Sequence, residues 1–264
     1  MHHENVNYMI NKEYFMSKLI LPKVIGHRGA KAYAPENTLA SIRAAADLGI
    51  EWVEVDVKLT KDGTAVLFHD ETLERCTSGS GPVAGITYAE LAELDAGSWF
   101  GESFIGERVP TLEEALNVVI DLGLGINLEI KSCPGREVET AEVMLDVATR
   151  LWPDNVAPPL VSSFSHVSLE AAFDMMPDWP RGFLMDEHIA QWKDMAEHLD
   201  AATININGNK VTEALVSEYL NLRKPVLAYT INDAARAKML FGWGVASVFS
   251  DCPDVIRAEV ESFH

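Results

Sequence analysis

The sequence predicts a (β/α)8 TIM barrel with a small insertion after its second strand. Short apolar runs alternate with amphipathic stretches of helical period along nearly the whole chain. Strand–helix alternation indicates right-handed crossovers and a parallel sheet, and eight such units fit the roughly 250 residues of a closed barrel. The alternative is an open doubly wound sheet. That fold ordinarily has a G-x-G-x-x-G turn after its first strand, whereas this chain has Gly26-His27-Arg28-Gly29.

The predicted strands are short and apolar, and a helix-like stretch follows each one. After the third strand, for example, apolar residues recur every three or four positions from Val138 to Leu151, which indicates the buried stripe of an amphipathic helix. The eight predicted strands cover residues 23–27, 51–57, 125–130, 159–163, 181–185, 202–206, 225–229 and 245–249.

One segment interrupts this alternation. Residues 64–68 form a further alternating stretch after the second strand, and roughly 40 residues separate it from the next barrel helix, a length that is usually functional in a compact domain. Capping boxes at Thr87–Glu90 and Thr111–Glu114 predict a helix near 88–95 and the start of that next helix. We expect residues 71–110 to fold as a small insertion subdomain over the site.

Composition and charge limit the partners. The chain has 21 basic and 40 acidic residues and a net charge of −19. This acidity disfavours nucleic acid and anionic membranes, because both need positive charge at the contact. An anionic substrate would need local positive charge, either from a bound metal or from basic residues in the cleft.

The remaining bulk features predict a cytoplasmic protein. Three scattered cysteines indicate reduced thiols rather than a disulfide framework or a zinc site. We find no secretory signal pattern and no apolar run of about 18 residues, so no membrane span is expected. Residues 1–17 are expected to be a loose extension, and residues 18–264 a single catalytic domain. The sequence leaves the oligomeric state open between a monomer and a homodimer.

Acidic residues gather where consecutive predicted strands end, which in a barrel is the position of the active site. Glu54 and Asp56 lie two positions apart on the second strand and therefore share a face, and Glu129 ends the third strand. Three carboxylates repel one another unless a cation lies between them. Oxygen ligands suit Mg²⁺ or Ca²⁺, with Mn²⁺ as a further candidate, better than zinc. The alternative is that Glu54 forms an ordinary ion pair with Lys58 or Arg28.

Two histidines and two cations lie beside these carboxylates. His27 and His69 each end a strand-like segment, and imidazole titrates near neutrality, which suits acid–base catalysis. Arg28 offers a bidentate fork for phosphate oxygens, and Lys131 offers a point charge.

An ordered set of short motifs resembles the glycerophosphodiester phosphodiesterase family. The motifs run from about residue 23 to residue 257, which is nearly the whole chain, and their ordered combination is far more specific than any one of them. They are His27-Arg28-Gly29, Pro35-Glu36-Asn37-Thr38, Glu54-x-Asp56, His69-Asp70, Pro110-Thr111-Leu112, Glu129-x-Lys131, Ser163-Phe164, Tyr229-Thr230-x-Asn232 and Ser250-Asp251-x-Pro253.

The resemblance implies a barrel with an insertion after strand two. It also implies that Glu54, Asp56 and Glu129 hold a divalent cation, and that His27 and His69 form the acid–base pair. These roles coincide with those expected from the residues alone.

The resemblance further implies that Arg28 and Lys131 bind the substrate phosphate. Glu36 is expected to support Arg28, and Asp70 belongs to the same outer layer of the site. Tyr229 stands where the family often has tryptophan, and it either stacks on the glycerol moiety or fills the top of the barrel.

The predicted function is hydrolysis of a small anionic glycerophosphodiester, such as glycerophosphocholine or glycerophosphoethanolamine, to glycerol 3-phosphate and an alcohol. The head group, the metal, the order in which the histidines act and the involvement of a cyclic phosphate stay open. One alternative is lysophospholipase D or sphingomyelinase D activity on lipids, which would favour an apolar rim or a secretory signal. Another is a non-catalytic barrel that binds a phosphometabolite, which should have lost a histidine or a carboxylate.

Overall fold

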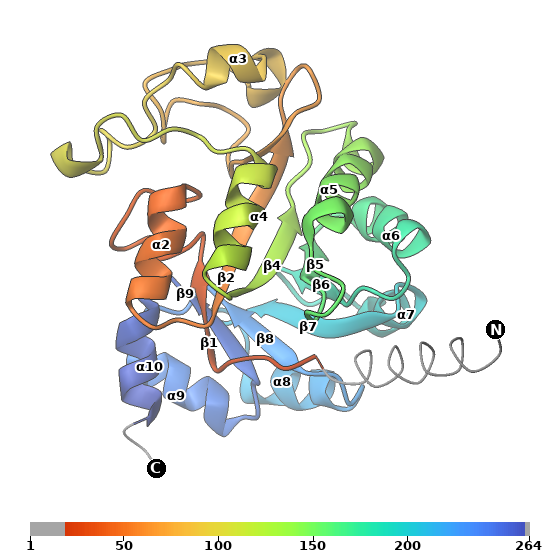
Figure 1. Cartoon of the computed structure of the whole chain (residues 1–264). Coiled ribbons are helices and arrows are strands. Elements are labelled where there is room, and N and C mark those ends of the chain that lie inside the picture. The colour runs from red at the N-terminus through yellow and green to blue at the C-terminus, as the bar shows by residue number, and fades with distance from the viewer. Residues whose placement is uncertain (1–18, 262–264) are drawn as a thin grey trace, which may run out of the picture.

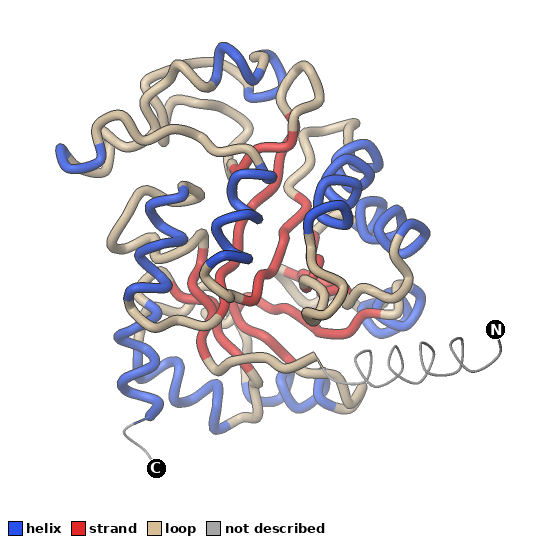
Figure 2. The backbone as a smooth tube through the Cα atoms, viewed as in Figure 1, coloured by secondary structure: helices blue, strands red, loops and turns tan. Residues whose placement is uncertain are grey.

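The structure is a computed structural model that describes residues 19–261. Within this range, eight parallel strands close into a barrel, and the helices surround the strands (Figures 1 and 2). The predicted (β/α)8 barrel is therefore confirmed. The extension expected at 1–17 lies outside the described residues. Among the described helices, none combines the length and the apolarity that a membrane crossing requires.

The strands agree with the predicted ranges to within two residues at each end. The sheet order is β1-β9-β8-β7-β6-β5-β4-β2-β3, and an additional β1–β2 pairing closes the barrel. In chain order the strands are β1 (Val24–His27), β2 (Trp52–Leu59), β3 (Ala65–Leu67), β4 (Gly125–Ile130), β5 (Leu160–Ser163), β6 (Arg181–Met185), β7 (Ala201–Asn207), β8 (Val226–Tyr229) and β9 (Ser247–Ser250).

Helices connect successive strands along the chain. Two short 3-10 turns, η1 (Val83–Gly85) and η2 (Glu102–Phe104), lie in the insertion. The α-helices are α2 (Leu39–Asp47), α3 (Tyr88–Leu91), α4 (Leu112–Asp121), α5 (Glu137–Leu151), α6 (His166–Met175), α7 (Trp192–His198), α8 (Glu213–Leu220), α9 (Ala234–Gly242) and α10 (Pro253–Glu261).

Strand β2 shows how the sequence pattern positions the site. Val53, Val55 and Val57 are fully buried in a cluster that includes Leu112 and Leu116 of α4. Each such side chain contributes roughly 1.5–3 kcal/mol when it is removed from water. Because side chains alternate along a strand, this packing turns the intervening polar residues of β2 toward the barrel interior.

β3 precedes the insertion and pairs antiparallel with β2. Figure 1 shows the segment that carries α3 lying beyond the arrowhead of β2, at the carboxyl end of the strands. Its interior is a separate apolar cluster that includes Leu73, Val83 and Leu91. That residues 71–110 form a subdomain over the site stays a prediction.

The predicted capping boxes are confirmed: Thr87 and Thr111 accept hydrogen bonds at the starts of α3 and α4. The helix expected near 88–95 is shorter than predicted and ends at Leu91. Asp95 explains the difference, because its carboxylate accepts hydrogen bonds from the backbone N–H groups of Gly97, Ser98 and Gly106 and so turns the chain.

Candidate active site

The turn after β1 carries the first two site residues. Arg28 adopts a left-handed backbone with φ 53°, and Gly29 follows with φ 85°. A Cβ atom on Gly29 would lie 2.5 Å from the carbonyl carbon of Ser41, so only glycine fits. The Arg28 N–H donates to Glu54 Oε2 at 2.9 Å, and the Ser41 hydroxyl donates to the Arg28 carbonyl. These contacts hold a strained turn beside the carboxylates of β2.

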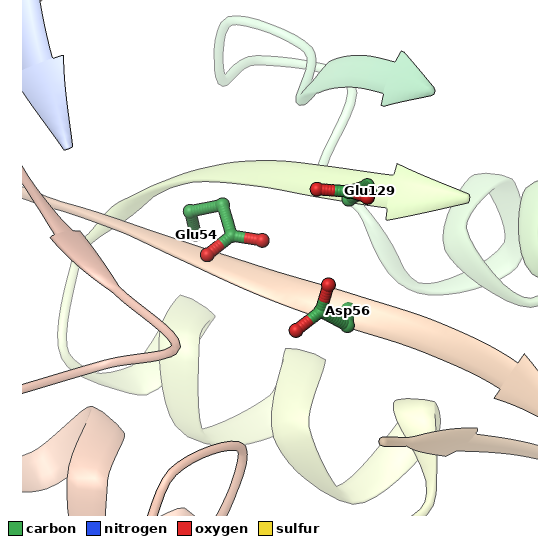
Figure 3. A group of neighbouring side chains, drawn as sticks. All are labelled: Glu54, Asp56 and Glu129. Atoms are coloured by element: carbon green, nitrogen blue, oxygen red, sulfur yellow. The ribbon is translucent and has the colours of Figure 1, made fainter. Parts of the chain in front are cut away.

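Glu54 and Asp56 of β2 lie next to Glu129 of β4, as Figure 3 shows. One oxygen from each of the three carboxylates lies within 4.8 Å of the others, and all three residues are buried. Glu54 Oε1 is buried and has no hydrogen-bond partner. A buried carboxylate oxygen without a partner is costly. The three residues therefore fit a divalent cation, because such an ion would satisfy that oxygen and reduce the repulsion among the carboxylates.

Burial and mutual repulsion perturb this cluster. Burial, together with the negative charges of neighbouring carboxylates, raises the pKa of Glu54 well above its ordinary value and that of Glu129 to about 7. For Asp56, burial is outweighed by Arg28, Lys131 and His69, and its pKa is lowered. The Asn37 amide also donates to Asp56 Oδ2 at 2.8 Å. Asp56 is therefore the carboxylate most firmly held in its charged form.

Each of the two predicted histidines is held by a carboxylate. His27 Nδ1 lies 2.6 Å from Asp251 Oδ1, and His69 Nδ1 lies 2.6 Å from Asp70 Oδ1. Since an ionised carboxylate only accepts, the proton of each neutral ring is on Nδ1, which leaves Nε2 for the pocket that both rings line. Burial is the largest influence on both rings and lowers both pKa values. Both imidazoles are thus favoured in the neutral form that can accept a proton.

A chain of ion pairs joins the two sides of the site. Arg28 Nη1 donates to Glu36 Oε1 at 2.6 Å. Arg75 donates to both oxygens of Glu36 at 2.8 Å, and to Asp70 at 2.6 and 2.9 Å. Arg28 Nε lies 3.1 Å from Asp56 Oδ2 but has no hydrogen-bond partner. The Arg28 guanidinium therefore retains a buried N–H group beside the carboxylate cluster.

The predicted substrate-binding residues line one pocket of about 150 Å³. Lys131 Nζ donates to Glu129 Oε1 at 2.6 Å and lies 5.1 Å from the centre of the Phe164 ring. Tyr229 meets the same ring edge-on, and its hydroxyl donates to the Met185 carbonyl at 2.8 Å. Burial raises the pKa of Tyr229. Tyr229 thus both lines the pocket and fixes the top of the barrel.

All ten residues expected at the site from the sequence lie in this region, either lining the pocket or in direct contact with residues that line it. Reasoning from the sequence placed none of Asp251, Arg75 and Asn37 among the site residues, although each contacts a predicted site residue. Asp251 and Asn37 belong to the motifs Ser250-Asp251-x-Pro253 and Pro35-Glu36-Asn37-Thr38, which could have indicated that both residues lie at the site. Arg75 lies in the insertion, where no helical or strand periodicity indicated which way its side chain points.

A closed parallel barrel with ionisable side chains at the carboxyl ends of its strands defines a TIM-barrel enzyme. Residues 27–255 match the model of the "Glycerophosphoryl diester phosphodiesterase family". The chain is 33% identical over 237 residues to a glycerophosphodiester phosphodiesterase of Caldanaerobacter subterraneus subsp. tengcongensis, covering 88% of this chain and 95% of the relative. It therefore belongs to the glycerophosphoryl diester phosphodiesterase family, and it is a phosphoric diester hydrolase.

Solved structures agree with this assignment. A phosphodiesterase of Oleispira antarctica, in complex with the product sn-glycerol-3-phosphate, superposes with a TM-score of 0.89 at 42% identity, over 91% of this chain and 97% of that one. A glycerophosphodiester phosphodiesterase of Agrobacterium tumefaciens superposes with a TM-score of 0.74 at 28% identity, over 90% of this chain and all of the other. The barrel and its family are thus supported by sequence and by structure.

Proposed function

We propose that the chain hydrolyses small glycerophosphodiesters to glycerol 3-phosphate and an alcohol. The observation that carries this proposal is the convergence of three buried carboxylates with two carboxylate-held histidines at one barrel mouth. The product bound to the Oleispira antarctica relative supports the same product here. Residues 18–264 would act as one catalytic domain, in which residues 71–110 form the insertion subdomain over the site.

Glu54, Asp56 and Glu129 would hold a divalent cation, either Mg²⁺ or Ca²⁺, with Mn²⁺ as a further candidate. When bound, such a cation supplies positive charge for the phosphate oxygens. The unpartnered Oε1 of Glu54 supports this assignment, since nothing else among the described residues satisfies it.

Arg28 and Lys131 would bind and orient the phosphate. The Arg28 guanidinium lines the pocket and suits phosphate oxygens, and Glu36 holds it in place by accepting from Nη1. Lys131 contributes a compact charge beside Glu129. This local positive charge offsets the net charge of −19, which would otherwise repel an anionic substrate.

His27 and His69 would move the protons. Nε2 of one ring accepts a proton from the attacking group, which is water or the neighbouring glycerol hydroxyl. When the glycerol hydroxyl attacks, a cyclic phosphate forms, and water then opens it to glycerol 3-phosphate. The other ring, protonated on both nitrogens, donates its Nε2 proton to the departing alkoxide as the bond between that oxygen and phosphorus breaks. Asp251 and Asp70 each hold Nδ1–H of their ring, so that Nε2 is the nitrogen that gains or loses the proton.

The direct test is release of glycerol 3-phosphate from glycerophosphocholine, glycerophosphoethanolamine and glycerophosphoinositol. We expect EDTA to abolish release and added Mg²⁺, Ca²⁺ or Mn²⁺ to restore it. If the folded protein released no glycerol 3-phosphate from any of the three diesters with any of these metals, the proposed function would be rejected.

Metal binding can be tested without activity. We expect Glu54→Gln to weaken the affinity for Mn²⁺, measured by calorimetry, by at least about ten-fold, or roughly 1.4 kcal/mol. Glu51→Gln is the matched control, because Glu51 is exposed and immediately precedes β2, away from the carboxyl end that carries the site. Equal affinities for the two variants would contradict the assigned site.

A further inference from the structure

A second hollow adjoins the active-site pocket. It is an open groove of about 480 Å³, formed where the chain leaves β2, β3, β4 and β5. The groove shares His69, Glu129, Lys131 and Phe164 with the pocket of about 150 Å³ described above. A phosphate bound by the shared residues would therefore have one hollow on each side.

The two hollows differ in size. A phosphodiester carries two alcohols, and here one of them is glycerol in every substrate while the other varies. The smaller pocket suits the constant three-carbon arm. The larger, more open groove suits the variable head group.

Lys58 is the unusual residue of the groove. It lies on β2, two positions after Asp56, and its side chain is only 1% exposed. Its nearest partners are Glu71 Oε1 at 3.9 Å and Cys133 Sγ at 4.0 Å. Neither is a strong hydrogen bond, and the Glu71 side chain is 61% exposed. A buried ammonium group without a close acceptor is costly unless a ligand supplies one.

The other charges around the groove already have partners. Asp70 accepts hydrogen bonds from His69 and Arg75. Glu129 accepts one from Lys131. Among the described residues that line the groove, Lys58 is therefore the cation with the most distant carboxylate partner, Glu71 at 3.9 Å, whereas His69 and Lys131 each have one at 2.6 Å.

We propose that this groove is the head-group subsite and that Lys58 selects alcohols that offer oxygen acceptors, as hydroxyl or carboxylate groups. This inference rests on the proposed function. A polyol can accept hydrogen bonds from the Lys58 ammonium. A quaternary ammonium head group offers no acceptor and carries charge of the same sign, so it is disfavoured.

Glycerophosphoinositol and glycerophosphocholine provide the test, because they share the glycerol arm and differ only in the head group. We expect the wild-type protein to have the higher kcat/KM for glycerophosphoinositol, by at least about ten-fold. Lys58→Met keeps an unbranched side chain of nearly the same length and removes its donors. It should lower that ratio by about ten-fold, mainly through KM for glycerophosphoinositol.

Lys210→Met is the matched control. Lys210 pairs with Asp186 in a separate hollow beyond β6 and β7, so its loss should leave the ratio unchanged. A ratio that is unaffected by Lys58→Met, or equally reduced by Lys210→Met, overturns the inference.

If Lys58→Met does not fold, product inhibition of the wild type decides: myo-inositol should inhibit more strongly than choline, and the reverse order rejects the subsite. Failure to release glycerol 3-phosphate from either diester rejects the proposed function, whereas release without preference rejects only the head-group assignment.

Discussion

His27 Nδ1 lies 2.6 Å from Asp251 Oδ1, although the two residues are 224 positions apart in the chain. The contact exists because β1 and β9, the first and last strands of the chain, are paired neighbours in the closed barrel. Asn232 fixes Asp251 in turn, since its amide nitrogen donates to Oδ2 at 2.8 Å and its amide oxygen accepts from the Asp251 N–H. Closure of the barrel therefore orients a histidine that is proposed to be catalytic.

Asp251→Asn should lower kcat sharply and leave KM nearly unchanged. The substitution keeps the shape of the side chain but removes the charge that fixes the Nδ1–H tautomer of His27, and a comparable change in a serine protease triad lowers kcat by about 10⁴-fold. We expect a loss of at least about 10²-fold here, measured by steady-state release of glycerol 3-phosphate.

Asp254→Asn is the control for this prediction, since Asp254 lies close by in sequence but accepts a hydrogen bond from the Tyr33 hydroxyl instead. Its turnover should match the wild type. Wild-type kcat in Asp251→Asn would show that the contact with His27 has no catalytic consequence.

His27→Ala and His69→Ala should each lower kcat by at least about 10²-fold, because each removes one member of the proposed proton-transfer pair. His198→Ala serves as the control. Its ring is largely exposed and lies near Glu170 on the outside of the barrel. If both purified site variants kept wild-type turnover, the acid–base assignment would be wrong.

Period and alternation were enough to predict the barrel and most of its site. The two-residue spacing of Glu54 and Asp56 put them on one face of β2, and the intervening valines indicated which face was interior. These features are local, so a single sequence contains them.

Contacts between distant segments could not be derived in the same way. The pairing of His27 with Asp251 depends on closure between the first and last strands. The direction of the Arg75 side chain depends on the irregular path of the insertion, where no period applies. For Lys58, the sequence allowed a pair with Glu54, but Glu54 accepts from the backbone of Arg28 and Lys58 is left without a close carboxylate.

Glu36 should make stability depend on pH in the acid range. Burial opposes its ionisation, but hydrogen bonds from Arg75 and Arg28 lower its pKa from 4.5 to about 2. A carboxyl group whose pKa is lower in the folded state stabilises the fold at pH values above its unfolded-state pKa, here by about 3 kcal/mol. This stabilisation is lost as the pH falls toward 2. The difference in the free energy of unfolding between the wild type and Glu36→Gln should therefore be largest at neutral pH, and it should narrow below about pH 4.5. Urea unfolding across this range would measure it, and a constant gap would contradict the assignment.

Arg75 should behave as a positioning residue, because it joins Asp70, which holds His69, to Glu36, which holds Arg28. Arg75→Ala removes one partner from each carboxylate and should lower kcat by about ten-fold or more. Arg75→Lys should recover little of this loss, since one ammonium cannot replace a guanidinium that bonds two carboxylates.

Because Arg75 and Asp70 act in one chain of contacts, their effects on kcat should not add: Arg75→Ala combined with Asp70→Asn should cost less than the sum of the two single changes. Arg150→Ala, at an exposed site on α5, is the control and should keep wild-type kcat. Additive losses would mean that Arg75 acts independently of Asp70.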